Sequence, residues 1–156
     1  MARGDILARI ESAAIVSVDT ETTSLDPLAA QIVGISFALD PHHACYIPLA
    51  HHYAGVPQQL DRETVLSRLK PLLENPVRPK LGQNLKYDKH VFANHGIMLE
   101  GIAHDTLLQS YVLESHKPHD MDSMALRHLG EKTVTYAEVA GKGAKQIGFD
   151  QVDIET

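Results

Sequence analysis

Short apolar runs and turn-forming residues alternate in the first third of the chain. The runs cover residues 15–19, 32–39 and 45–49, and they are rich in β-branched and aromatic side chains. Asp26-Pro27 and Asp40-Pro41 lie between them, as expected for turns. Strands joined by such short connections are most simply antiparallel. The pattern therefore predicts three antiparallel strands.

The apolar spacing changes to a helical period after the third strand. Asp61 is a suitable N-cap and Pro76 would follow the end of the helix, whose apolar stripe consists of Val65, Leu66, Leu69, Leu72 and Leu73. A short strand is expected at residues 80–82. The helix that follows is expected to be capped by Asn84 and to run to about Asn94.

Two further helices are expected, beginning near Asp105 and Asp120. The apolar stripe at 107–113 is predicted to face the core rather than a partner. Residues 133–156 are predicted to be mostly loop. Strands followed by a helix, another strand and more helices predict one α/β domain, in which helices flank a mixed β-sheet.

The composition limits the class of protein. The chain has 156 residues, of which 44% are hydrophobic and 22% charged, as in a single globular domain. A single cysteine, Cys45, excludes an internal disulfide and favours a reducing compartment. The sequence contains no apolar run of the ~20 residues that span a bilayer, and the N-terminus does not resemble a signal peptide. We therefore expect a cytoplasmic protein without a membrane partner.

The net charge of −6 restricts the partners further. Proteins that bind duplex nucleic acid along its length are usually basic, because they neutralise phosphates. An acidic chain can still act on a phosphate ester where bound metal ions supply the positive charge. The charge argues against a stand-alone duplex-binding protein and is compatible with a metal-dependent enzyme.

Two carboxylates end the first predicted strand. Side chains alternate between the two faces of a strand, so Asp19 and Glu21 point the same way. Such a pair repels unless a cation joins the two groups, and Mg2+ or Mn2+ prefers oxygen ligands of this kind. Two solvated acids followed by turn residues would give the same pattern, so the motif alone leaves both interpretations open.

A third carboxylate, Asp88, lies one turn into the helix that begins at Asn84. If this helix packs beside the first strand, Asp88 faces Asp19 and Glu21. The alternative is a solvated acid in the first turn, where the helix dipole favours negative charge.

Five segments closely resemble the 3′–5′ exonuclease domain of bacterial DNA polymerase I. They occur in the same order and at similar spacing, and they are VDTET at 18–22, GQNLKYD at 82–88, IAHDT at 102–106, HDMDS at 119–123 and AGKG at 140–143. The resemblance implies an RNase H-like fold. It also implies membership of the DEDD exonucleases, in which four acidic residues bind two divalent metal ions.

The resemblance assigns roles to the three carboxylates. Asp19, Glu21 and Asp88 would be catalytic residues and ligands of two divalent ions, Mg2+ or Mn2+. Asp19 would bridge both ions, Glu21 would hold the ion on the side of the nucleophile and contact the terminal hydroxyl, and Asp88 would serve the second ion through water. The implied reaction hydrolyses the 3′-terminal phosphodiester of single-stranded or frayed DNA.

The same resemblance implies contacts with nucleic acid. Leu25 would wedge against the terminal bases and Tyr136 would lie near the strand end, although both side chains equally fit ordinary packing. Gln83, Asn84 and Lys86 would contact the single strand.

The third motif of this family, Tyr-x-x-x-Asp, is absent from the 156 residues. Tyr111 and Tyr136 are followed four positions later by Ser115 and Ala140. In the family this motif supplies the tyrosine that orients the attacking water and the fourth metal ligand. We therefore expect residues 1–156 to form a single exonuclease domain, truncated before its last catalytic helix and weak or inactive alone. The expected partners are the 3′ end of single-stranded DNA and a polymerase domain of the same parent protein, in the bacterial nucleoid.

Two alternatives remain. A non-catalytic structural domain of a polymerase would keep the fold without the activity, although Asp19, Glu21 and Asp88 are all present. A ribonuclease D-like 3′ exonuclease acting on RNA would share the catalytic plan, but the segments 82–88 and 119–123 favour the polymerase relative.

Overall fold

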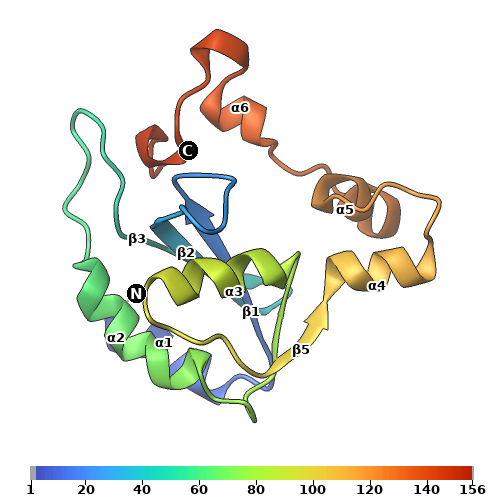
Figure 1. Cartoon of the computed structure of the whole chain (residues 1–156), viewed down its shortest axis with the longest axis horizontal. Helices are drawn as coiled ribbons and strands as arrows, with labels where there is room; N and C mark the ends of the chain where they lie inside the picture. Colours follow the sequence, from blue (N-terminus) through green and yellow to red (C-terminus); the bar gives the residue numbers. More distant parts are fainter. Residues whose placement is uncertain (1–2, 156) are drawn as a thin grey trace.

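A five-stranded sheet forms the centre of the protein. The computed structural model describes residues 3–155, and its strands lie in the order β3-β2-β1-β4-β5 (Figure 1). They are β1 (Val16–Thr22), β2 (Ile32–Asp40), β3 (His43–Pro48), β4 (Lys80–Gly82) and β5 (Ile102–Asp105). The first three strands pair antiparallel, as the sequence predicts, while β4 pairs parallel with both β1 and β5. The sheet is therefore mixed, and the predicted α/β class is confirmed.

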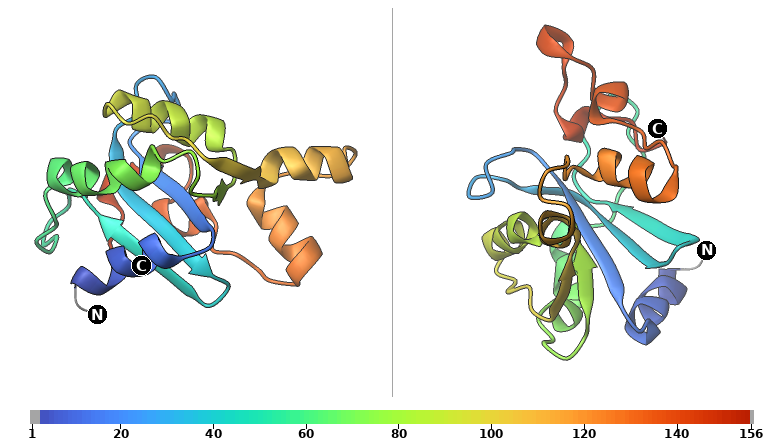
Figure 2. Two further views of the ribbon diagram at one scale, coloured as in Figure 1. Left: turned by 90° about the horizontal axis from the view of Figure 1, so that it is seen from below. Right: turned by 90° about the vertical axis from the view of Figure 1, so that its right-hand side faces the viewer.

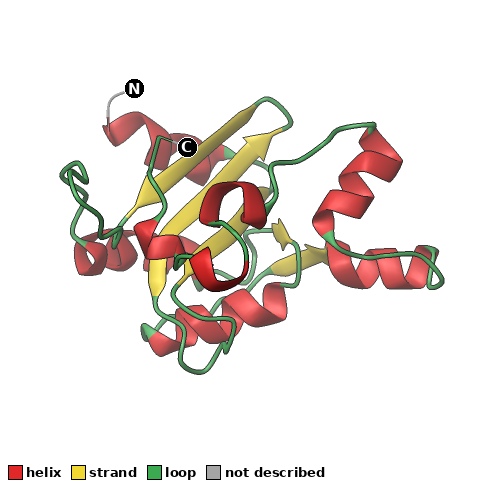
Figure 3. Cartoon of the chain, turned by 90° about the horizontal axis from the view of Figure 1, so that it is seen from above, coloured by secondary structure: helices red, strands yellow, loops and turns green. Residues whose placement is uncertain are grey.

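Some helices pack against this sheet and others extend beyond its edge (Figures 2 and 3). They are α1 (Arg3–Ser12), α2 (Arg62–Leu73), α3 (Leu85–Asn94), α4 (Thr106–Leu113), α5 (Met121–Leu129) and α6 (Tyr136–Ala140), with the 3-10 turns η1 (Gly143–Lys145) and η2 (Phe149–Gln151). Helix α1 and strand β5 are additional to the predicted elements. The first three residues of β5 are exposed, so this strand carries no apolar period that a sequence pattern would reveal.

The alternation along β1 decides which of its residues enter the core. Val16, Val18 and Thr20 are buried, whereas Asp19 and Glu21 lie on the opposite face of the strand. The buried valines join a cluster with apolar residues of β2, α2 and α3. A slip of one residue would place both carboxylates in this core, so the register is strongly specified.

Helix α2 agrees closely with its prediction. The Asp61 carboxylate accepts a hydrogen bond from the Thr64 amide at 2.8 Å, a cap that contributes about 1 kcal/mol. The predicted stripe packs inward, with Val65 partly buried and with Leu66, Leu69, Leu72 and Leu73 buried.

Helix α4 contradicts the prediction that the apolar stripe at 107–113 faces the core. Helices α4 and α5 project from the sheet beyond its edge strand β5 (Figures 1 and 3). Leu108, Val112 and Leu113 are 61%, 86% and 77% exposed. The spacing indicated an amphipathic helix correctly, but a period does not say which surface will cover the apolar side.

The segment after α5 returns to the sheet. Apart from α6, η1 and η2 it is loop, as predicted. The His52 amide donates to the Asp150 carbonyl at 2.6 Å, which ties η2 to the loop after β3. Within the described residues, no helix combines the length and the apolar character needed to cross a membrane.

Candidate active site

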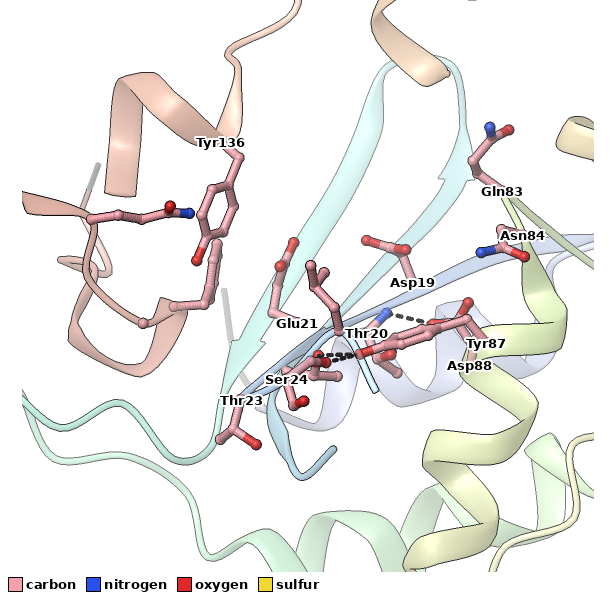
Figure 4. A pocket seen from close by; sticks show the side chains of 15 residues that line it. Asp19, Thr20, Glu21, Thr23, Ser24, Gln83, Asn84, Tyr87, Asp88 and Tyr136 are labelled. Carbon is pink, nitrogen blue, oxygen red and sulfur yellow. Dashed lines mark hydrogen bonds between the residues drawn. The ribbon is translucent and has the colours of Figure 1, made fainter. Parts of the chain in front are cut away.

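The carboxylates at the end of β1 line a cleft of about 400 Å3. Asp19 and Glu21 lie on one face of the strand, and Figure 4 shows both side chains standing away from it. The cleft combines segments far apart in the sequence, and its lining consists of Asp19, Thr20, Glu21, Thr22, Thr23, Ser24, Leu25, Gln83, Asn84, Tyr87, Asp88, Tyr136, Gln146, Gly148 and Phe149. The three predicted catalytic carboxylates therefore share one cleft.

Asp88 reaches the cleft from α3 and is held by Thr20. Its Oδ1 accepts hydrogen bonds from the Thr20 amide at 3.0 Å and from the Thr20 hydroxyl at 2.7 Å. Strand β4 pairs with β1 only at Val16 and Ser17, so the carboxylate of Asp88 takes the place of a strand partner. Asp88 is only 2% exposed, which excludes the alternative of a solvated first-turn acid.

Burial raises the pKa of all three carboxyl groups. Desolvation raises the pKa of Asp19. Desolvation, followed by the charges of Asp19 and Asp88, raises the pKa of Glu21 to about 7. The pKa of Asp88 rises to about 6, because burial and the charge of Asp19 outweigh the hydrogen bonds from Thr20. The described lining of the cleft includes no Lys, Arg or His, so the ionised carboxylates need a cation from solution.

The three carboxylates fit a hard divalent cation. Carboxylate oxygens are the ligands that Mg2+ and Mn2+ prefer. Among the side chains that the structure describes, no three or more from His, Cys, Asp or Glu gather around one point that could hold an ion. Mg2+ commonly takes one or two protein carboxylates and keeps several waters. The pair of Asp19 and Glu21, whose charges interact, has the number of carboxylates that such an ion takes.

The loop after β1 holds Leu25 at the rim of the cleft. Leu25 is 96% exposed, so it is not a packing residue of this fold. The loop itself is fixed from α3, because the Tyr87 hydroxyl donates to the Ser24 carbonyl at 2.5 Å and lies 2.5 Å from the Thr22 hydroxyl.

Tyr136 stands on the opposite side of the cleft (Figure 4). The residue is 45% exposed, and its ring stacks on Phe149 with the ring centroids 6.3 Å apart. Its hydroxyl donates to the Ile147 carbonyl at 3.3 Å. One face of the ring therefore packs while the side chain also lines the cleft, so packing and a contact with a ligand are compatible.

The other three predicted contacts differ from one another. The Gln83 side chain donates to the His119 carbonyl at 2.9 Å and accepts from the Thr106 hydroxyl at 2.5 Å, so it links the start of α3 to the segment around α4. The Asn84 side chain lines the cleft but makes no capping hydrogen bond, and its predicted capping role is wrong. Lys86 is exposed on α3 and is not part of the cleft lining.

Asp105 supplies the cap that Asn84 does not. Its carboxylate accepts from the amides of Asn84 at 3.1 Å and Leu85 at 2.9 Å, and also from those of Leu107 at 3.0 Å and Leu108 at 3.3 Å. Asn84 has a φ of 59°, a left-handed conformation that asparagine tolerates. One carboxylate thus fixes the start of α3, which carries the third acid of the cleft, and the start of α4.

Sequence reasoning did not single out the residues that hold the acids and the rim in place. Thr20 lies between the first two carboxylates and Tyr87 directly precedes Asp88. A hydroxyl next to a site carboxylate in the sequence was the available signal in both places.

Solved structures share this fold at low sequence identity. The Pol1 of M. smegmatis, solved with a DNA primer-template and dNTP, matches with a TM-score of 0.67 and 20% identity over 82% of this chain and 21% of its own. Brucella melitensis NrnC with bound Mg2+ matches with a TM-score of 0.62 and 19% identity over 80% of this chain and 57% of its own. Escherichia coli RNase D, an exoribonuclease, matches with a TM-score of 0.58 and 19% identity over 83% of this chain and 32% of its own. These likenesses establish the RNase H-like fold.

Sequence relatives are closer. DNA polymerase I of Pseudomonas aeruginosa is 55% identical over 152 residues, which is 96% of this chain and 17% of the relative. DNA polymerase I of Chloroflexus aurantiacus is 36% identical over 99% of this chain and 16% of the relative. The chain thus spans about a sixth of the length of these relatives. A family model described as a 3′–5′ exonuclease matches residues 3–152. The chain belongs to the 3′–5′ exonuclease domain family of bacterial DNA polymerase I, a family of nucleases.

Proposed function

We propose that this domain hydrolyses the 3′-terminal phosphodiester of single-stranded or frayed DNA, as the proofreading unit of a DNA polymerase I. The observation that carries the proposal is the convergence of Asp19, Glu21 and Asp88 in one cleft. The exposed Leu25 at its rim offers an apolar surface for a terminal base. Removal of a mispaired nucleotide requires an unpaired end, and a cleft of this kind suits a splayed single strand.

Asp19, Glu21 and Asp88 would hold two divalent ions, Mg2+ or Mn2+, with Asp19 shared between them. Bound there, such ions supply an activated water and offset the charge that develops on the phosphate. Thr20 keeps the Asp88 carboxylate turned toward β1 through two hydrogen bonds. Glu21 has its pKa raised to about 7, so it must lose a proton before it can serve as a ligand.

The acidic cleft makes nucleic-acid binding dependent on the cation. Without an ion, the carboxylates repel the phosphates of the strand. With ions bound, the local charge is reversed while the chain keeps its net charge of −6. We therefore expect single-stranded DNA to bind with divalent ions and to dissociate on chelation.

The remaining partner would be the polymerase domain of the parent protein, because the relatives are DNA polymerases I. The Tyr-x-x-x-Asp motif of the resemblance is not among the 156 residues. We therefore expect this polypeptide alone to bind metal more weakly, and to cleave more slowly, than a longer polypeptide that carries the motif.

A strand-shortening assay tests the proposal. A 5′-labelled single-stranded DNA is incubated with Mn2+ and either this chain or the longer polypeptide, beside an RNA and a duplex of the same sequence. The expected result is a ladder of products shortened from the 3′ end, strongest with the longer polypeptide. Asp19→Ala should abolish the ladder, whereas the matched surface variant Glu63→Ala should not. A ladder that persists in Asp19→Ala would refute the assignment of the cleft.

A ribonuclease is the second candidate function. The shared fold with RNase D supports it. Faster shortening of the RNA than of the DNA would favour this candidate. No shortening of either strand by the longer polypeptide would favour a non-catalytic structural domain.

A further inference from the structure

Two hydrogen-bonded side chains, Tyr46 and His51, lie outside the cleft lining but beside one of its acids. The Tyr46 hydroxyl and the His51 Nε2 are 2.6 Å apart. On its other side, the His51 Nδ1 lies 3.0 Å from the carbonyl oxygen of Val152. His51 is 5% exposed, so both of its ring nitrogens are satisfied within the protein.

The Val152 carbonyl sets the tautomer of His51, and the tautomer sets the direction of the hydrogen bond with Tyr46. A carbonyl oxygen only accepts, so the His51 Nδ1 must carry a hydrogen. Burial lowers the pKa of His51, so the ring is neutral and its Nε2 presents a lone pair. The Tyr46 hydroxyl therefore donates to Nε2.

Glu21 lies near the same hydroxyl. Glu21 stands directly opposite Gly34 in the β1–β2 pair, and a Cβ placed on Gly34 would lie only 2.0 Å from the Tyr46 hydroxyl oxygen. The hydroxyl thus occupies the place of the side chain that faces Glu21 across the strands, where Cβ atoms are about 5 Å apart. Burial and then the charge of Glu21 raise the pKa of Tyr46, in agreement with this proximity.

We propose that His51 is a positioning residue of the site, which keeps Glu21 free for a cation by holding the proton of Tyr46. A hydroxyl that donated to Glu21 would compete with the ion for the carboxylate oxygens. Val152 fixes the tautomer of His51, so the C-terminal segment controls the arrangement. The inference rests on the proposed function in one respect, namely that Glu21 is a cation ligand.

The test measures Mn2+ affinity by the electron paramagnetic resonance signal of the free ion. His51→Asn keeps a donor toward Val152 and removes the acceptor for Tyr46, so the freed hydroxyl should donate to Glu21. We expect the Kd for Mn2+ to rise about tenfold, as for one hydrogen bond to a charged group. Adding Tyr46→Phe removes the competing donor and should bring the Kd back to within about threefold of the original.

Two comparisons complete the design. His51→Gln offers an amide oxygen near the position of Nε2 and should retain most of the affinity. Thermal unfolding verifies that each variant is folded. A merely structural role for His51 predicts that the double variant binds no better than His51→Asn, and that result would overturn the proposal.

Imidazole 15N chemical shifts of the metal-free wild type give a readout that requires no variant. They should show a protonated Nδ1 and an unprotonated Nε2 at His51, and the opposite tautomer would also overturn the proposal. If the wild type binds Mn2+ no better than Asp19→Ala does, the proposed metal site itself fails, and this inference fails with it.

Discussion

Asp88→Asn should stabilise the metal-free protein while weakening the proposed cation site. The asparagine keeps a carbonyl oxygen that can accept both hydrogen bonds from Thr20, now made at 3.0 Å and 2.7 Å. Its amide group can donate to the neighbouring acids, and its lack of charge removes their repulsion. The substitution therefore exchanges a ligand for stability, as is common at functional sites.

The magnitude follows from the pKa of Asp88, which rises from 3.8 to about 6 in the folded protein. Between these values the folded state keeps a proton that the unfolded state has released, so stability falls as the pH rises through this window. Above it the penalty is complete and amounts to about 3 kcal/mol, at 1.36 kcal/mol for each pKa unit. Wild type and variant should be similar near pH 4, and the variant should be more stable by about 2–3 kcal/mol at pH 8.

Urea unfolding followed by circular dichroism measures this difference in the presence of a chelator. Glu63→Gln, on the exposed surface of α2, makes the same change of charge and should have little effect. Mn2+ should offset this difference, because the wild type gains about 4.1 kcal/mol of binding free energy at an ion concentration of 1,000 Kd, whereas the variant lacks one of the three carboxylates and gains less. A variant less stable than the wild type at pH 8, or stabilised equally at both pH values, would refute the reasoning.

Three further predictions concern the protonation of Glu21, the close contact at Gly34 and the exposed Leu25. Because Glu21 titrates at about pH 7, the Kd for Mn2+ should rise about tenfold from pH 8 to pH 6, and a calorimetric titration that shows no change would contradict this. Gly34→Ala forces a Cβ against the Tyr46 hydroxyl, so urea unfolding should show a loss of about 1–3 kcal/mol; unchanged stability would refute the close approach. Leu25→Ala should slow strand shortening without moving the urea midpoint. Leu28 is also exposed, and Leu28→Ala should leave the rate unchanged. Equal rates in the two variants would exclude a role for Leu25.

Local patterns determined the parts of the fold that the sequence predicted correctly. The alternation that ends in Asp19 and Glu21 specifies a face, because one side of β1 is buried. The cap at Asp61 and the leucines of α2 lie within a few positions of one another, so one turn of helix relates them. The cleft acids on β1 were predictable for the same reason.

Features that depend on distant parts of the chain were not predictable in this way. The cap of α3 comes from Asp105, and Asn84 has the residue type of a cap without its side-chain contact. The apolar side of α4 follows a helical period whether or not another surface covers it, and Val112 is in fact exposed. Side-chain partners that are close in space but far apart in sequence leave no periodic trace.

Because Asp105 caps α3 from a later position in the chain, the ribosome synthesises the helix before its cap. Asp105 follows Asn84 by 21 positions, which take about 1–4 s to translate at 5–20 residues per second. During this interval the nascent helix that bears Asp88 has no cap for its first amides. A translational pause between these two codons would lengthen the interval during which the start of α3 lacks its cap.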